Sequence, residues 1–344
     1  MATLAQVTSE TRIILKIAGA LFALLFVLFM FVKGGEIVKK VFFPSPPQPP
    51  DEKFGKLPSI SFPTQKNPSY SFKINTITGK LPVFPDRMKV YKVVQDEPNL
   101  SALSNTRTKI KSIGYTDKET KLSDTKYEWS KSSGEYIVYD TLTNNFWVNS
   151  NYLNASSALG YLSLKKDDAI RNATIMMGNL KVDTSDLDDG KTSFTFYKIV
   201  DRKLVKVDSQ NDAEVARLDF FQKDAEQGTS IYYPDLPKSI IYFIFGVRGG
   251  LPQILEAQFN HYPLDKTNFA TYGIKTADSA YEDLKNGKGY FIMDNQIKKN
   301  SSVVITDLSL GYYIGEGNQK YVMPIAVFQG NGFVGYIPLI PEDN

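Results

Sequence analysis

The distribution of apolar and polar residues first sets apart a long apolar run near the start of the chain. Residues 13–32 are apolar apart from Lys16, and the centre of the run holds only Leu, Phe, Ala, Val and Met. A helix of about 20 such residues spans roughly 30 Å, which is the thickness of the hydrocarbon core of a bilayer. We therefore expect a single-pass transmembrane helix over 13–32, and a location in the cell membrane.

Two other interpretations of this run are a buried core helix and the apolar part of a cleaved signal peptide. The run has no polar face, which disfavours the first. It is longer than the roughly 7 to 15 residues of a signal-peptide core, and it is followed by Lys33-Gly34-Gly35-Glu36, which favours an uncleaved signal-anchor. Basic residues are nearly balanced on its two sides. We expect a cytoplasmic N-terminus over 1–12 because a long C-terminal part usually crosses after a single signal-anchor.

A proline-rich segment follows the apolar run. Residues 44–50 are Pro-Ser-Pro-Pro-Gln-Pro-Pro, and the fixed φ and missing amide donor of proline favour extended polyproline II over a helix. We predict that 33–53 is a semi-rigid linker between the membrane and the rest of the chain. A docking ligand for an aromatic-lined groove is the functional alternative.

From residue 69 onward the pattern is mainly period two, as in antiparallel strands. Tyr70, Phe72 and Ile74 share one face of such a strand. Apolar residues at helical spacing interrupt this pattern and predict three helices, over 100–113, 166–180 and 276–284.

This order of elements predicts an α+β fold, in which antiparallel sheets are each covered by one helix. We place a first module at 54–155. A second α+β region follows at 156–344, and it divides into 156–265 and 266–344 if it holds two modules.

Composition narrows the range of functions. The 344 residues carry a formal net charge of +3, which is not the basic footprint of a nucleic-acid-binding protein, so we expect no nucleic-acid partner. The chain has no cysteine and one histidine, His261. The usual zinc ligand sets cannot be built from these, and we expect no metal and no cofactor.

Candidate catalytic groups are few, and we expect no catalytic residues and no enzyme activity. His261 lies among aromatic residues at the end of a predicted strand, where a structural role is favoured over acid or base catalysis. The acidic run 183–190 could suggest calcium. However, aligning Gly190 with the glycine of a calcium loop puts Leu187 and Phe196 where oxygen ligands belong, so a solvated turn is the better interpretation.

The C-terminal part carries an ordered set of motifs. Residues 277–284 fit A-x-x-A-Y-x-x-L, and they are followed by Leu-Gly-Tyr-Tyr at 310–313 and Tyr-Val-Met-Pro at 321–324. This stretch resembles the terminal module of YycH/YycI-type proteins and the related PepSY-like modules of bacteria. The resemblance implies an extracytoplasmic domain, tethered by one N-terminal helix, that regulates a cell-envelope sensor kinase by contact and has no catalytic residues.

Tyrosines of this stretch form the candidate interaction surface. Tyr312 and Tyr313 point to opposite faces of a strand, so one of them is expected to be exposed or at an interface. The candidate surface consists of Tyr281, Tyr290, Tyr312 and Tyr313.

Our leading hypothesis is a membrane-anchored, extracytoplasmic, non-catalytic binding or regulatory protein that acts by contact with another envelope or membrane protein. Its oligomeric state is left open by the sequence. One alternative is a structural component of the cell wall or surface layer. Another is a carboxylate-dependent envelope hydrolase, which would need two carboxyl groups about 5 to 9.5 Å apart in an open cleft.

Overall fold

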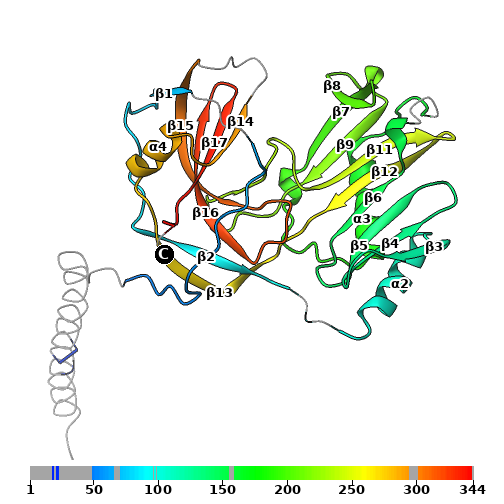
Figure 1. The fold of residues 1–344 in the computed structure, drawn as a ribbon, viewed down its shortest axis with the longest axis horizontal. Helices are drawn as coiled ribbons and strands as arrows, with labels where there is room; N and C mark the ends of the chain where they lie inside the picture. Colours follow the sequence, from blue (N-terminus) through cyan, green and yellow to red (C-terminus); the bar gives the residue numbers. More distant parts are fainter. Residues whose placement is uncertain are drawn as a thin grey trace, which may run out of the picture. The chain divides into compact units, whose positions relative to one another are not determined.

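The computed structural model describes residues 49–65, 70–95, 97, 99–154, 159–293 and 301–342, together with Ala18, Leu21 and Phe22. Residues 50–344 form one compact unit and residues 1–49 form another. The described part of the larger unit contains 17 strands and three α-helices (Figure 1).

The larger sheet has nine strands in the order β3-β4-β5-β6-β12-β11-β9-β7-β8, and every pairing in it is antiparallel. Its strands are β3 (Lys118–Lys121), β4 (Lys126–Ser130), β5 (Tyr136–Asp140), β6 (Phe146–Asn149), β7 (Ser193–Val200), β8 (Lys203–Val207), β9 (Val215–Phe220), β11 (Ile241–Arg248) and β12 (Leu251–Phe259). Hairpins join β3 to β6 in sequence, whereas the pairing of β6 with β12 joins segments far apart in the chain.

The second sheet has eight strands, with a central order β1-β15-β16-β17-β14. The strands β1 and β10 pair with β15 in parallel, and the other pairings are antiparallel. Its strands are β1 (Ser71–Ile74), β2 (Arg87–Val93), β10 (Ile231–Tyr232), β13 (Leu264–Gly273), β14 (Tyr290–Met293), β15 (Ser302–Tyr313), β16 (Tyr321–Gly330) and β17 (Phe333–Pro338).

The chain enters and leaves through the eight-stranded sheet, and the nine-stranded sheet is inserted between β2 and β13 (Figure 1). The strand β10 returns from the inserted part to pair with β15, which ties the two sheets together. The predicted module boundary at 155/156 lies between β6 and β7, two strands of the same sheet.

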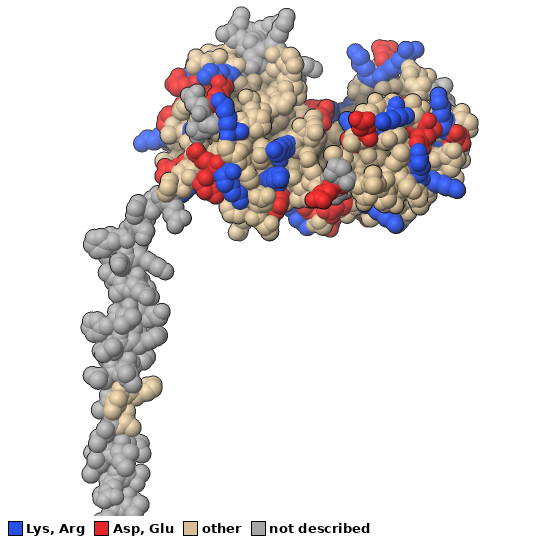
Figure 2. Space-filling model, turned by 60° about the horizontal axis from the view of Figure 1, so that its bottom comes forward, with Lys and Arg blue, Asp and Glu red and all other residues tan. Residues whose placement is uncertain are grey.

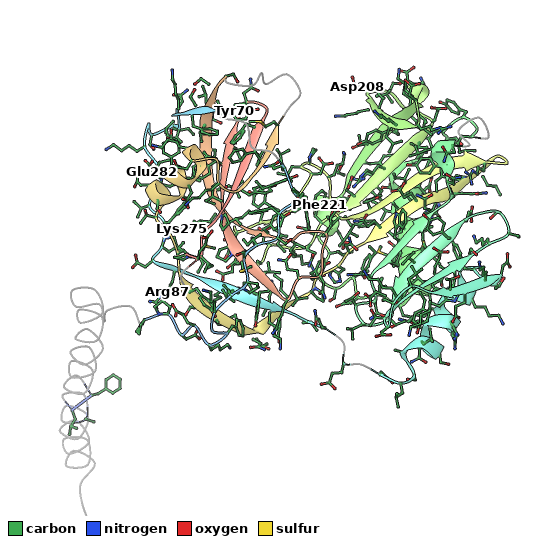
Figure 3. All side chains as sticks on the ribbon, viewed as in Figure 1. Tyr70, Arg87, Asp208, Phe221, Lys275 and Glu282 are labelled. Atoms are coloured by element: carbon green, nitrogen blue, oxygen red, sulfur yellow. The ribbon has the colours of Figure 1, made fainter. Side chains whose placement is uncertain are left out.

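One apolar core runs through both sheets because period-two alternation turns one side of every strand inward. It includes Phe243 and Phe259 of the nine-stranded sheet and Tyr312 and Phe328 of the eight-stranded sheet. Phe221 lies where the two sheets meet, with its ring centroid 6.1 Å from that of Tyr233 (Figure 3).

Each helix turns one apolar side into this core. The helices are α2 (Ala102–Ser112), α3 (Lys166–Asn179) and α4 (Ala277–Lys285). Ile110 of α2 and Met177 of α3 join the inner face of the nine-stranded sheet, and Leu284 of α4 joins that of the eight-stranded sheet. Thr276 caps α4 by accepting a hydrogen bond from the backbone N–H of Ser279.

Residues 51–62, which we call the strap, lie along the outer face of the eight-stranded sheet. The Tyr272 hydroxyl donates to the Gly55 carbonyl at 2.8 Å, and Leu57 is buried against this sheet. Phe62 packs its ring on Tyr313, with centroids 4.7 Å apart. The first residues after the proline-rich segment are therefore part of the folded unit.

The expected fold class, α+β with antiparallel sheets each covered by one helix, is wrong for the described part of the chain. The three predicted helices are confirmed within a few residues. However, they are short, and two of them lie on the same sheet. Long-range pairings join the strands into two large sheets, so the fold is mainly β. Periodicity identifies strands, but it does not show which strands pair across long stretches of chain.

Among the described residues, no helix has the length and apolar character that a membrane crossing needs. The expected span, 13–32, lies outside the described residues except for Ala18, Leu21 and Phe22. The expected cytoplasmic segment 1–12 and most of the expected linker 33–53 also lie outside them.

Candidate functional site

Two of the predicted interaction residues are buried. Tyr312 is 0% exposed and Tyr313 is 1% exposed, so the expectation that one of them lies at the surface is wrong. The physical reason is that both faces of β15 are covered at this point. Tyr312 packs on Tyr91 in the main core, and Tyr313 packs on Phe62 of the strap.

The other two predicted residues are half-buried and tied to backbone groups. The Tyr281 hydroxyl donates to the Phe72 carbonyl at 2.9 Å, and the Tyr290 hydroxyl donates to the Pro234 carbonyl at 3.0 Å. Tyr281 packs against the main core, whereas Tyr290 packs on the opposite side of the sheet under the strap. The four tyrosines therefore do not form one surface, and their contacts are with their own chain.

The nine-stranded sheet presents a different kind of outer face. Alternation along β4, β5, β6 and β12 buries one set of side chains and leaves the other set half-buried or exposed. We call the second set the open outer face. Its members are Glu128, Ser130, Tyr136, Val138, Trp147, Asn149, Glu256 and Gln258.

Trp147 is the most prominent side chain of the open outer face. It is 37% exposed, whereas the second tryptophan, Trp129, is 5% exposed and points into the core. The rings of Trp147 and Tyr136 meet edge to face, with centroids 5.3 Å apart and an angle of 82° between their planes. This geometry is favourable for an aromatic pair and holds the indole in place while leaving part of it accessible.

Trp147 also lines a pocket of about 330 Å³ where the nine-stranded sheet meets the loop between β15 and β16. We call it the junction pocket. Its polar lining groups come from three segments: the ends of β4 to β6, the turn after β12, and that loop. They include Lys126, Asp140, Asn145, Asn260, Glu316 and Asn318.

Hydrogen bonds fix the backbone around the junction pocket. The Asn145 side-chain Oδ1 accepts from the His261 backbone N–H at 2.9 Å. The Tyr262 hydroxyl donates to the Gly317 carbonyl at 2.6 Å, which joins the turn after β12 to the loop of the other sheet. The Asp140 carboxylate accepts from the backbone N–H of Leu142 at 3.0 Å. The pocket is thus largely pre-formed, as small binding sites usually are.

Negative charge gathers at both ends of the open outer face. Burial first, and then the charges of Asp140 and Glu316, raises the pKa of Tyr262 to about 12. At the other end, burial and then the charges of Glu128 and Glu256 raise the pKa of the Tyr136 hydroxyl. Each hydroxyl therefore lies within electrostatic reach of two carboxylates. Elsewhere the surface mixes both signs, as Figure 2 shows for one face.

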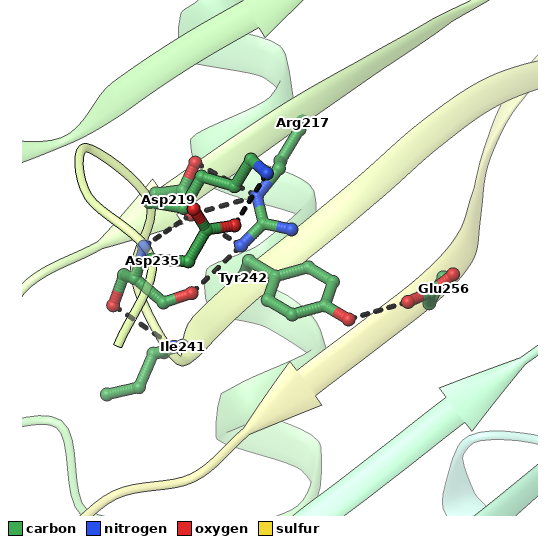
Figure 4. Close-up of polar contacts among 8 residues, drawn as sticks. Arg217, Asp219, Asp235, Ile241, Tyr242 and Glu256 are labelled. Atoms are coloured by element: carbon green, nitrogen blue, oxygen red, sulfur yellow. Dashed lines mark hydrogen bonds and ion pairs between the residues drawn. The ribbon is translucent and has the colours of Figure 1, made fainter. Parts of the chain in front are cut away.

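Beyond Glu256, the outer face closes over a buried polar cluster (Figure 4). The Arg217 guanidinium donates to Asp219 at 3.0 Å and to the Ser239 carbonyl at 2.8 Å, and it lies 3.6 Å from the centre of the Tyr242 ring. The Tyr242 hydroxyl donates to Glu256 at 2.6 Å. Burial raises the pKa of Asp219, and the charge of Arg217 opposes that shift. The cluster anchors one end of the open outer face.

The single histidine lies beside the junction pocket and is 5% exposed. Its Nε2 is 2.5 Å from Asp186 Oδ1. Asp186 belongs to the acidic run 183–190, and Gln222 donates to its second oxygen at 3.0 Å. No local sequence pattern predicts this pairing, because 75 positions separate the two residues.

Apolar periodicity does not single out the site around Trp147, because it predicts an ordinary strand there. A signal was present: Phe146 and Val148 mark the buried side, so Trp147 must share the other side with the polar Asn145 and Asn149. A tryptophan on the polar side of a strand indicates a surface with a binding role more strongly than a tyrosine in an apolar strand does.

Comparisons with known proteins leave the function open. No protein-family profile and no curated protein matches the chain. Among solved structures, the chain is similar to an uncharacterized protein from Eubacterium rectale ATCC 33656, with a TM-score of 0.38 and 10% sequence identity over 77% of this chain and 87% of that one. That likeness carries no functional argument. The resemblance to YycH/YycI-type and PepSY-like proteins stays a prediction from the sequence.

Proposed function

We propose that residues 50–344 form a non-catalytic binding or regulatory protein that acts by contact with another protein, and that the contact site is the open outer face with the junction pocket. The observation that carries the proposal is the position of Trp147, which is 37% exposed and forms a wall of the pocket. Tryptophan and tyrosine are the side chains most enriched at the centres of protein interfaces.

The surroundings of Trp147 support contact with a protein surface. The edge-to-face contact with Tyr136 orders the indole in advance, so binding costs little conformational entropy. The adjoining pocket offers a recess for one side chain of the partner, and its carboxylate and amide groups supply hydrogen-bond donors and acceptors. Apolar anchor, recess and polar rim are the parts of a typical interface centre.

Site-specific photo-crosslinking tests the proposal in cells that produce the full chain. A benzophenone amino acid at position 147 is compared with the same amino acid at position 161, where Tyr161 is 63% exposed but lies outside the site. We expect one discrete polypeptide to be crosslinked from position 147 and not from position 161. No crosslink to a polypeptide from 147, or the same products from both positions, would contradict the proposal.

A carboxylate-dependent hydrolase is the second candidate, because Asp140 and Glu316 line the same pocket. Paired carboxylates flanking a cleft are the machinery of glycoside hydrolysis. Incubation of the full chain with purified cell-wall glycan, followed by detection of new reducing ends, tests it. Hydrolysis that Asp140→Asn and Glu316→Gln each abolish would favour this candidate over a contact function.

A further inference from the structure

The charge of the open outer face indicates what kind of partner segment it takes. Four carboxylates border the face and the pocket, from Glu128, Asp140, Glu256 and Glu316. Two lysines oppose them: Lys126 lines the pocket, and the exposed Lys118 is the register partner of Ser130 at the β3 edge of the same face. The face therefore carries an excess of negative charge, and complementary charge favours a basic partner segment.

The spacing of the carboxylates follows the length of one strand. On β5, Tyr136, Val138 and Asp140 point to the same face, and Trp147 is the register partner of Val138. Four residues of strand cover roughly 13 Å, so the Asp140 end and the Tyr136 end are about that far apart. In an extended peptide, side chains i and i+4 also share one face at about 13 Å, with i+2 midway between them.

We infer that the partner segment is an extended basic peptide with Lys or Arg at positions i and i+4 and an apolar residue at i+2. This rests on the proposed function of the same site. The cation at i enters the junction pocket beside Asp140 and Glu316. The residue at i+2 covers the Trp147 indole. The cation at i+4 lies over the Tyr136 ring, where aromatic and carboxylate groups both attract it.

Peptide binding to the full chain tests this spacing. A fluorescein-labelled Gly-Lys-Thr-Leu-Thr-Lys-Gly has the inferred pattern. Its matched control, Gly-Lys-Thr-Lys-Thr-Leu-Gly, has the same composition with one lysine moved. A third peptide replaces both lysines of the first with glutamate. Fluorescence anisotropy at low salt measures the affinities. The first peptide should bind about tenfold more tightly than the second, because the second reaches only one pair of carboxylates. The glutamate peptide should not bind.

Single substitutions assign the two ends of the peptide. Glu316→Gln should weaken both lysine peptides by up to about fivefold, whereas Glu128→Gln should weaken only the first peptide. Lys126→Gln should tighten both, because it removes a like charge from the pocket. Asp208→Asn, at an exposed carboxylate after β8, is the matched control and should change nothing (Figure 3). These side chains are at the surface, so the variants should fold.

The outcomes separate this inference from the proposed function. If the two lysine peptides bound equally well, and Trp147→Ala abolished the binding of both, the inferred spacing would be wrong and the proposed contact site would still be supported. Crosslinking at position 147 to a partner that no basic peptide displaces would overturn the basic character of the segment. Binding of a neutral oligosaccharide such as cellohexaose, without binding of any peptide, would overturn the inference and replace it with a carbohydrate site.

Discussion

The outer faces of the two sheets are both rich in aromatic side chains, but the chain covers one of them and leaves the β4–β6 part of the other open. On the eight-stranded sheet, the ring of Phe62 stacks on Tyr290 and meets Tyr313, with centroids 5.8 Å and 4.7 Å away. On the nine-stranded sheet, Trp147 remains 37% exposed beside Tyr136. The difference shows that aromatic content alone does not locate a binding surface. A face that is already occupied contributes to stability, and an exposed one is free to contact a partner.

Truncation of Tyr313 should show the largest effect on the covered face. Its side chain is 1% exposed, so Tyr313→Ala leaves a cavity under the strap and should lower the free energy of unfolding by about 3–5 kcal/mol. Urea denaturation of the full chain measures this value. Tyr313→Phe is the matched control and should cost almost nothing, since the hydroxyl has no hydrogen-bond partner among the described residues. A loss below about 1 kcal/mol for the alanine variant would mean that the strap does not seal this face.

Loss of the Phe62 ring should have a smaller effect. Phe62 is half-buried, so Phe62→Ala should cost about 1–2 kcal/mol, less than full burial of an aromatic ring provides. The strap should then open locally, and proteases should cleave within 51–62 sooner than in the parent. Phe62→Leu keeps most of the apolar contact and should resist cleavage like the parent. Unchanged cleavage in the alanine variant would show that other strap contacts, such as Leu57, are sufficient.

The sequence predicted local structure well and the covered face poorly. Apolar spacing located all three helices, because one buried stripe such as Ala169, Ala173 and Met177 leaves a local signature. The burial of Tyr313 had no such signature. It depends on Phe62, which is far away in sequence and follows a proline-rich stretch that resembles a linker. The spacing of apolar residues within a segment does not show which distant segment it will contact.

The candidate site was predictable only in part. Alternation of Phe146, Trp147 and Val148 is enough to put the tryptophan on the polar side of a strand. The pocket beside it is not predictable in this way, because Glu316 comes from the other sheet and reaches the site through the inserted topology. The acidic run 183–190 connects α3 to β7, as predicted, but it is not solvated throughout, because Leu187 is buried and Asp186 pairs with the buried His261.

The Asp186–His261 pair, at the seam between the two sheets, should give a smaller and pH-dependent effect. Burial is the largest single influence and acts to raise the pKa of Asp186. The hydrogen bond and charge of His261, together with the hydrogen bond from Gln222, outweigh it and hold that pKa below its usual value. Because the pKa of Asp186 is lower in the folded state, the pair stabilises the fold at pH values above the unfolded-state pKa of about 4. This stabilisation is lost as the pH falls through the folded-state pKa of Asp186.

Asp186→Asn should therefore cost about 1–2 kcal/mol at pH 6, where the carboxylate is charged, and the difference from the parent should shrink as the pH falls below the unfolded-state pKa of about 4. Urea denaturation across this pH range measures it. Asp208→Asn, which removes an exposed carboxylate, is the matched control and should leave the free energy of unfolding at pH 6 unchanged. A cost that stayed constant down to pH 2 would assign the role of Asp186 to packing and not to its charge.

Truncation of Trp147 should have the smallest effect on stability and the largest on contact. The side chain is 37% exposed and packs on Tyr136, so Trp147→Ala should lower the free energy of unfolding by about 1 kcal/mol, much less than truncation of the buried Tyr313. The same substitution should weaken partner binding by about 30-fold or more, since interface-centre tryptophans typically account for at least about 2 kcal/mol. Trp147→Phe keeps an aromatic ring and should recover part of the binding. If Trp147→Ala instead destabilised the fold as much as Tyr313→Ala does, the indole would be a core residue, and the two outer faces would not differ in the way that the contact site requires.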